Sequence, residues 1–375
     1  MLTLTLIGVT LISSVRPAMA SGIIYIRADG SIDPPTAPIS SLDDITYTFT
    51  DDIYDSIVVE RSNIIIDGNG HTLQGSGSGK GFSWNSINNV TVKRTNIKDF
   101  QYGIFFLTSS DSNIFENTVA NNSWAGIFLV HAENSSVFGN FVTNNNCGIG
   151  LEIEVNFNRI VGNKIVNNNA DGIFVNDQSN HNSITENYVA GNAGGIYIGP
   201  LPCSGTFIFH NDFINNANYQ AIIASMYGEP SINTWDDGYP SGGNYWSDYI
   251  SRYSEAQGLD DSGIWNTPYN IDENNQDNYP LMEPWTPTPP TPTEVLEELI
   301  ETIEAWNLPK GTENSLTSKL EQALRALDKG NEHGTSHKLR SFINHVEALR
   351  DKKLTEEQAD FLISDAQRII DLINE

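Results

Sequence analysis

Apolar and polar positions repeat with a nearly constant period through the middle of the chain. A Gly-Ile pair returns every 22 to 24 residues, and Ala221-Ile222 takes its place in the last unit. From the second pair onward, an asparagine stands eight to ten residues before each pair, with one apolar residue three positions before it and another two positions after it. A period of this length predicts a solenoid. The glycines are Gly103, Gly126, Gly148, Gly172 and Gly195, and the asparagines are Asn117, Asn140, Asn163, Asn187 and Asn211.

Each unit holds three short stretches of alternating residues and no window with helical periodicity. One short strand per side of a repeating coil predicts a right-handed parallel β-helix of about 23 residues per coil over residues 57–228. The apolar positions then form inward ladders, and equivalent asparagines bond from coil to coil. The ladders are Ile114, Val137, Ile160, Ile184 and Ile208, and Val119, Val142, Ile165, Val189 and Phe213.

The segments that flank the repeat differ from it in composition. Residues 21–56 contain strand-like stretches and are expected to cap the open amino-terminal end of the solenoid, with the first regular coil opening at Ile64. Residues 229–285 are aromatic and acidic and are expected to cap the other end. Residues 286–293, TPTPPTPT, are typical of a stiff linker.

After the linker the apolar period becomes that of helices. Residues 294–375 contain four amphipathic stretches with short connections, which predict a small helical bundle. Thr355, followed three positions later by Gln358, predicts a capped start for the last helix.

Residues 1–20 have the pattern of a signal peptide. A short apolar run, Leu2 to Ile12, is followed by Ala18-Met19-Ala20, a cleavage site of small residues. We expect export and a secreted or cell-surface location, with a short amino-terminal anchor as the alternative. No later segment reaches about 18 apolar residues, so no transmembrane span is expected in the mature chain.

The charge balance excludes several partners. The chain has 47 Asp and Glu against 20 Lys and Arg, a net charge of −27, which argues against nucleic acid and anionic membranes. Its two cysteines exclude a disulfide-built scaffold. Cys147 and Cys203 lie two coils apart in the predicted repeat, so both are expected as free thiols.

Both halves resemble known families. The repeat, together with GYPSGGNYWSDY (238–249), TPYNID (267–272) and QDNYPLMEPW (276–285), resembles the NosD-like β-helix proteins, which are abundant on archaeal cell surfaces. The last segment resembles the FIMAH domain through LEQALRALDKGN (320–331), FINHVEAL (342–349) and LTEEQADFLISDAQRIIDLI (354–373). The FIMAH resemblance implies attachment or contact with a protein partner, and it implies no enzymatic role.

Metal sites have little support in the sequence. Many NosD-like relatives carry an oxygen-rich loop before TPY, but several of its carboxylates are missing here. The best calcium cluster that remains is Asp236, Asp237, Asp248, Asp260 and Asp261. The family name suggests copper, which needs His, Met or Cys ligands at workable spacing, and these residues are scattered. No cofactor is expected, and calcium is the alternative.

Two outward surfaces are candidate sites. Glu152 and Glu154 alternate with inward Leu151, Ile153 and Val155, and are the candidates for catalytic carboxylates. The outward residues of successive coils are Phe105, Phe128, Gly150, Phe174 and Tyr197, an aromatic row on which sugar rings can stack. The gap at Gly150, beside Glu152 and Asn176, is a candidate subsite. A loop or residues 239–246 lying over this row is the alternative.

These observations favour an exported, non-catalytic β-helix protein that binds or organises cell-surface glycan or another surface partner. The expected ligand-binding residues are Phe105, Phe128, Glu152, Phe174, Asn176 and Tyr197. A polysaccharide lyase or glycoside hydrolase is one alternative, and a purely structural surface rod is another.

Overall fold

The computed structural model describes residues 22–224, 230–285, 291–306, 308–327, 329–350 and 352–373. The predicted signal peptide and most of the predicted Pro/Thr linker lie outside these residues. The chain divides into two compact units, residues 1–286 and 287–375. The first unit holds the β-strands, and the second holds the four long helices.

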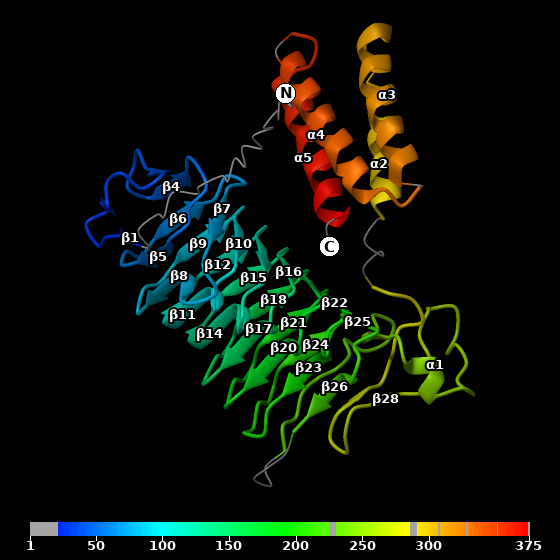
Figure 1. The fold of residues 1–375 in the computed structure, drawn as a ribbon. Helices are drawn as coiled ribbons and strands as arrows, with labels where there is room; N and C mark the ends of the chain where they lie inside the picture. The colour runs from blue at the N-terminus through cyan, green and yellow to red at the C-terminus, as the bar shows by residue number, and fades with distance from the viewer. Residues whose placement is uncertain are drawn as a thin grey trace, which may run out of the picture. The chain divides into compact units, whose positions relative to one another are not determined.

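The first unit is a parallel β-helix whose coils lie on three long sheets (Figure 1). In-register partners such as Ile104, Ile127, Ile149, Ile173 and Ile196 are 22 to 24 residues apart, which confirms the predicted period.

Successive coils contribute neighbouring strands to each sheet. In spatial order, the ten-stranded sheet consists of β2 (Ile32–Asp33), β1 (Ile23–Ile26), β5 (Ser56–Val59), β8 (Lys80–Asn85), β11 (Tyr102–Ser110), β14 (Ala125–Glu133), β17 (Cys147–Glu152), β20 (Asp171–Asn176), β23 (Gly194–Ile198) and β26 (Tyr219–Ile223). The eight-stranded sheet consists of β27 (Tyr245–Trp246), β25 (Asp212–Ile214), β22 (Tyr188–Ala190), β19 (Lys164–Val166), β16 (Phe141–Thr143), β13 (Thr118–Ala120), β10 (Asn96–Lys98) and β7 (Thr72–Gln74). The nine-stranded sheet consists of β24 (Phe207–Phe209), β21 (Ser183–Thr185), β18 (Arg159–Val161), β15 (Ser136–Phe138), β12 (Asn113–Phe115), β9 (Val90–Lys93), β6 (Ile64–Asp67), β4 (Thr46–Phe49) and β3 (Ile39–Ser40).

The interior is built from the predicted ladders. The five residues from Ile114 to Ile208 pair in register in the nine-stranded sheet, and those from Val119 to Phe213 pair in the eight-stranded sheet. All ten side chains are fully buried. Because burying one such side chain contributes about 1.5–3 kcal/mol, the repetition of these positions holds the coils together.

Asparagine ladders join the corners of the coils, as predicted. The Nδ2 atom of Asn117 donates to Oδ1 of Asn140 at 3.0 Å, and Asn140 donates to Asn163 at the same distance. This ladder continues to Asn244, and a second one runs from Asn122 to Asn216. A third corner, which includes Asn158 and Asn182, was not predicted. Each buried amide is satisfied by its neighbours, so the polar corners do not destabilise the interior.

Both ends of the solenoid extend further than the sequence predicts. At the amino-terminal end, β1 and β4 already pair in parallel with β5 and β6, so regular coils begin before Ile64. At the other end, β27 pairs in parallel with β25 and places Trp246 beside Phe213, with ring centroids 4.8 Å apart. The interior stack therefore continues into the aromatic cap, which also contains α1 (Tyr249–Arg252), β28 (Tyr269–Asn270) and β29 (Gln276–Asp277).

Two predicted registers are wrong. In the last coil Ile196 pairs with Ala221 and Tyr197 pairs with Ile222, so Ala221-Ile222 lies one position beyond the place of the Gly-Ile pair.

The second wrong register is at the end of β17. The strand ends at Glu152, and Ile153 and Glu154 both have positive φ values, 63° and 52°. This turn carries Ile153 to the outer apolar cluster around Phe128, so Ile153 does not face inward.

The second unit contains four helices, α2 (Pro292–Ala305), α3 (Lys310–Leu327), α4 (Glu332–Leu349) and α5 (Glu356–Ile373). They bury one apolar core, which includes Leu299, Leu320, Phe342 and Ile369. Helix α2 begins inside the predicted linker, because proline at the first helical position sacrifices no hydrogen bond. None of the described helices is long and apolar enough to cross a membrane.

The predicted cap of α5 is confirmed. The backbone nitrogen of Gln358 donates to Thr355 Oγ1 at 3.1 Å, and the backbone nitrogen of Thr355 donates to Gln358 Oε1 at 3.0 Å. This reciprocal pair satisfies two backbone donors at the start of the helix.

Candidate functional site

The predicted aromatic row lies on the outer face of the ten-stranded sheet. Phe105, Phe128, Gly150, Phe174 and Tyr197 occupy adjacent register positions on β11, β14, β17, β20 and β23. Because side chains alternate across a strand, these residues face away from the interior ladders. The row divides into two halves with different surroundings.

The first half is a packed apolar cluster. The rings of Phe105 and Phe128 stack with centroids 6.3 Å apart, Tyr102 packs against both, and Lys80 Nζ lies 3.4 Å from the centre of the Phe105 ring. Phe128 is only 4% exposed. A Cβ atom at Gly150 would lie 2.4 Å from the Phe128 ring. The predicted gap at Gly150 is therefore filled, since Phe128 leans over the glycine.

The second half presents partly exposed rings. Phe174 and Tyr197 stack with centroids 5.5 Å apart and an interplanar angle of 8°. Phe174 lies between Asp171, three positions before it, and Asn176, two positions after it, whereas Gly194 and Gly199 occupy these positions beside Tyr197. At the same register positions, the adjoining strands add Glu152 beside Asn176 and Tyr219 beside Gly194, so two polar rows flank the ring pair. This half is our candidate site.

The first polar row contains Asp171 and Tyr219, and neither was predicted from the sequence. The Tyr219 hydroxyl donates to Asp171 Oδ1 at 2.5 Å, passing over Gly194 of the intervening strand β23. Burial raises the pKa of the Asp171 carboxyl, although the bond from Tyr219 lowers it. Burial, followed by that bond, also raises the pKa of Tyr219.

The sequence analysis missed these two residues for different reasons. Asp171 stands two positions before the inward Ile173, so simple alternation would place it inward; a Cβ atom at Gly172 would also point inward, toward Val189, and this break in the alternation turns Asp171 to the outer face. Tyr219 could not be placed, because its coil is displaced by one residue from the predicted register. Cys147 lies one coil before Asp171, and burial raises the pKa of its thiol.

Glu152 and Asn176 form the second polar row, directly opposite each other on β17 and β20. Glu152 makes no hydrogen bond or ion pair with any residue that the structure describes. Asn176 Oδ1 is buried and has no hydrogen-bond partner. A Cβ atom at Gly199 would lie 1.9 Å from Asn176 Oδ1, so the amide rests over this glycine.

The second catalytic candidate lies elsewhere. Glu154 follows the end of β17 and its Oε2 is 3.3 Å from Nδ1 of His131. Because the chain turns at Ile153, Glu152 and Glu154 do not share a strand face, and the predicted pair of neighbouring carboxylates is not formed.

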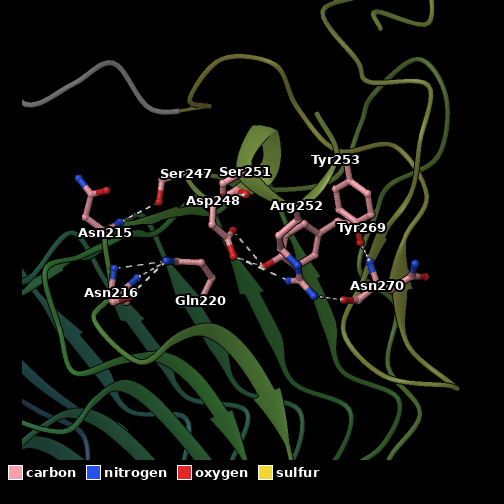
Figure 2. A network of polar contacts seen from close by, with 10 residues as sticks. All are labelled: Asn215, Asn216, Gln220, Ser247, Asp248, Ser251, Arg252, Tyr253, Tyr269 and Asn270. Atoms are coloured by element: carbon pink, nitrogen blue, oxygen red, sulfur yellow. Dashed lines mark hydrogen bonds and ion pairs between the residues drawn. The ribbon is translucent and has the colours of Figure 1, made fainter. Parts of the chain in front are cut away.

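The calcium candidates are engaged in separate local contacts. Asp248 accepts hydrogen bonds from Tyr269 at 3.1 Å and lies 3.8 Å from Arg252. The Nη2 atom of Arg252 donates to the Asn270 carbonyl (Figure 2). A cationic partner at this carboxylate opposes the binding of a second cation.

The other four aspartates are likewise dispersed. Asp236 accepts from Asn278, Asp237 accepts from Ser241, and Asp260 accepts from Tyr239. The Asp261 side chain makes no hydrogen bond or ion pair with a described residue. Across the described ranges, no group of three or more His, Cys, Asp or Glu side chains is arranged to hold a metal ion.

The sequence of the β-helix matches one family model over residues 43–251, which is more than half of the chain. That model is described as periplasmic copper-binding protein (NosD). The chain belongs to the NosD family. A second model, the FIMAH domain, matches residues 293–371. Both matches agree with the resemblances drawn from the sequence.

Solved structures similar to this NosD-family chain are β-helix proteins with low identity. A mutant of the periplasmic alginate epimerase AlgG has 22% identity and a TM-score of 0.38, over 46% of this chain and 39% of its own. The Dettilon tailspike protein has 15% identity and a TM-score of 0.38, over 50% and 52%. The A-module of a mannuronan C-5 epimerase from Azotobacter vinelandii has 12% identity and a TM-score of 0.32, over 54% and 71%.

These likenesses carry no conclusion about activity or ligand. The chain spans less than two thirds of the length of the first two proteins. No curated protein matches the chain.

The NosD family description names copper, so we compared the cysteine and histidine side chains of the β-helix with what a copper site requires. Burial raises the pKa of the Cys203 thiol to about 11 and raises that of Cys147, so neither supplies a thiolate readily. His210 stacks on Trp285 with ring centroids 3.5 Å apart, and His131 lies beside Glu154. The described donors of the β-helix do not converge, so they do not fit a copper site.

Three further histidines lie in the FIMAH unit, and one of them, His345, lies 3.1 Å from the Ser315 hydroxyl. His333 and His337 are exposed and one turn apart on α4. No third ligand joins them among the described residues.

Proposed function

We propose that this NosD-family protein is exported and binds a saccharide chain, without cleaving it, on the outer face of its ten-stranded sheet. The observation that carries the proposal is the partly exposed Phe174–Tyr197 pair, which lies between two rows of hydrogen-bonding side chains. Aromatic rings with polar groups at their sides are the common elements of sugar recognition, because sugars have apolar ring faces and hydroxyl rims.

The shape of the face supports an extended ligand. The rings and the polar side chains of the face come from four successive strands of the sheet, β17, β20, β23 and β26. Coils repeat about every 4.8 Å along the axis, so a ligand that spans several coils meets equivalent positions in turn. The family description as periplasmic and the predicted signal peptide support an extracytoplasmic location.

The proposal is tested by retention of the full chain on a panel of insoluble and immobilised polysaccharides. We expect retention by at least one glycan, and its loss in Phe174→Ala and Tyr197→Ala. Phe138→Ala is the matched control, since Phe138 is also a partly exposed ring stacked on a neighbour, Phe115, but on the nine-stranded sheet. Equal loss in the control, or retention in all variants, would contradict the proposal.

Product analysis in the same assay addresses the enzymatic alternative. Release of unsaturated or reducing-end products that disappears in Glu152→Gln would show that the protein is a lyase or hydrolase and would contradict a purely binding function. Absence of retention on every glycan would favour the structural rod. For the FIMAH unit we propose contact with a protein partner, in line with its family resemblance.

A further inference from the structure

The two carboxylates of the candidate site keep acceptor oxygens that no described residue uses. Asp171 uses Oδ1 to accept from Tyr219, and its Oδ2 accepts from no described residue. Glu152 on the neighbouring strand β17 likewise has no hydrogen-bond partner among the described residues. A partly buried carboxylate oxygen without a donor costs free energy, so this face is complementary to a ligand that brings donors.

Positive charge is missing from the same part of the sheet. Strands β11, β14, β17, β20, β23 and β26 contain no lysine or arginine. Lys80 on β8 lies over the Phe105 ring, in the packed half of the row. Glu152 and Asp171 therefore have no cationic partner on these strands, and the whole chain adds a net charge of −27. A polymer of uronates or sulfated sugars would be repelled here.

We infer that the ligand of this face is a glycan with free ammonium groups, a polymer of deacetylated amino sugars. An ammonium group has three donors and a positive charge, so it satisfies the open acceptors and neutralises a half-buried carboxylate. The sugar rings pack on Phe174 and Tyr197 between the two acceptor rows. This inference rests on the proposed function, because it names the substrate class of the same face.

Burial of Asp171 is consistent with this assignment. Its pKa is raised by burial in the free protein, which means that the charged form lacks compensation there. A ligand ammonium supplies that compensation and would lower the pKa on binding.

The test compares three oligosaccharides of equal length by calorimetry with the full chain at pH 6 and physiological salt. They are β-1,4-linked glucosamine, its fully N-acetylated counterpart and oligomannuronate. We expect glucosamine to bind at least about tenfold more tightly than the N-acetylated oligomer, and oligomannuronate not to bind.

Variants separate a specific site from general attraction to an acidic protein. Glu152→Gln and Asp171→Asn should each weaken glucosamine binding about tenfold. Glu116→Gln removes an exposed carboxylate between β12 and β13 and should change nothing. Glu152 has no partner among the described residues, so its variant should fold normally, and asparagine at 171 can still accept from Tyr219.

The outcomes distinguish two kinds of failure. Equal binding of the amino and N-acetylated oligomers, or preferred binding of oligomannuronate, would overturn the ammonium assignment and leave a glycan-binding face. Equal weakening by Glu116→Gln would also overturn it, because the attraction would then be diffuse. If no saccharide binds, in this assay or on the polysaccharide panel, the proposed function itself fails.

Discussion

Tyr219 donates a hydrogen bond to Asp171 although the strands that carry them are separated by β23. The contact exists because β23 has a glycine at the intervening position. A Cβ atom at Gly194 would lie 2.3 Å from Asp171 Oδ1 and 2.5 Å from the Tyr219 ring. This pair belongs to the candidate site, so its geometry is open to direct tests.

Gly194→Ala should separate Asp171 from Tyr219. The added methyl group cannot be accommodated without moving both side chains, and we expect a loss of about 1–3 kcal/mol in the free energy of unfolding. Denaturant titration measures this loss, and ligand retention should fall with it. Gly258→Ala is the control, because a Cβ atom there would meet only ordinary contacts, the nearest at 3.4 Å. Equal effects of the two substitutions would show that the Asp171–Tyr219 contact is not the cause.

Asn163→Ala should be among the most destabilising substitutions at a polar position. The Asn163 amide donates to the Val137 carbonyl at 2.9 Å and to Asn187 Oδ1 at 3.0 Å, and its Oδ1 accepts from Asn140. Truncation leaves several buried partners unsatisfied, so we expect a loss of roughly 3 kcal/mol or more.

Equilibrium unfolding in urea checks the asparagine prediction. Asn169→Ala is the control, since Asn169 is exposed and should change stability by less than about 0.5 kcal/mol. A loss at Asn163 no larger than at Asn169 would mean that the ladder amides are dispensable.

Asp277 should make the cap pH-dependent. It is fully buried, and burial raises the pKa of its carboxyl to about 7 despite bonds from the Asn244 backbone and the Trp246 indole. Between the ordinary pKa of 3.8 and about 7, the folded chain keeps a proton that the unfolded chain loses. Below pH 3.8 this proton contributes its full stabilisation. As pH rises from 3.8 to about 7, the free energy of unfolding falls by about 1.4 kcal/mol per pH unit, and above about 7 the contribution is lost.

Urea titrations from pH 5 to pH 8 measure this dependence, with Asp277→Asn as the comparison. In the original protein the Tyr279 backbone nitrogen donates to Asp277 Oδ1. In the variant an amide nitrogen, itself a donor, faces this nitrogen, so the variant is expected to be less stable at pH 5. The informative quantity is the slope with pH, which should be flatter in the variant. Identical slopes would show that Asp277 does not titrate in this range.

Thr355→Ala should weaken the start of α5 in the FIMAH unit. The Thr355–Gln358 pair is reciprocal, and loss of such a cap costs about 1 kcal/mol. Amide hydrogen exchange in the full chain should show faster exchange in the first turn of α5. Thr355→Ser retains the hydroxyl and should exchange like the original protein; equal protection in the alanine variant would argue against the cap.

Sequence periodicity alone determined the architecture of this NosD-family chain. The Gly-Ile pairs, the apolar ladders and the asparagines recur at one period, and a parallel solenoid is the fold in which residues one period apart meet. Sequence motifs also indicated the two families. The helical bundle and the capped start of α5 could be predicted because a helix and its cap depend on residues three or four positions apart.

The tertiary structure decided where the candidate site lies. Which way the Phe128 ring leans, how Asp171 meets Tyr219 across Gly194, and where the chain turns after Glu152 depend on contacts between coils and on backbone angles. Because the last coil is displaced by one residue, the repeat does not predict the position of Tyr219. Periodicity places each residue on a face, but packing between neighbouring side chains determines which of them a ligand can reach.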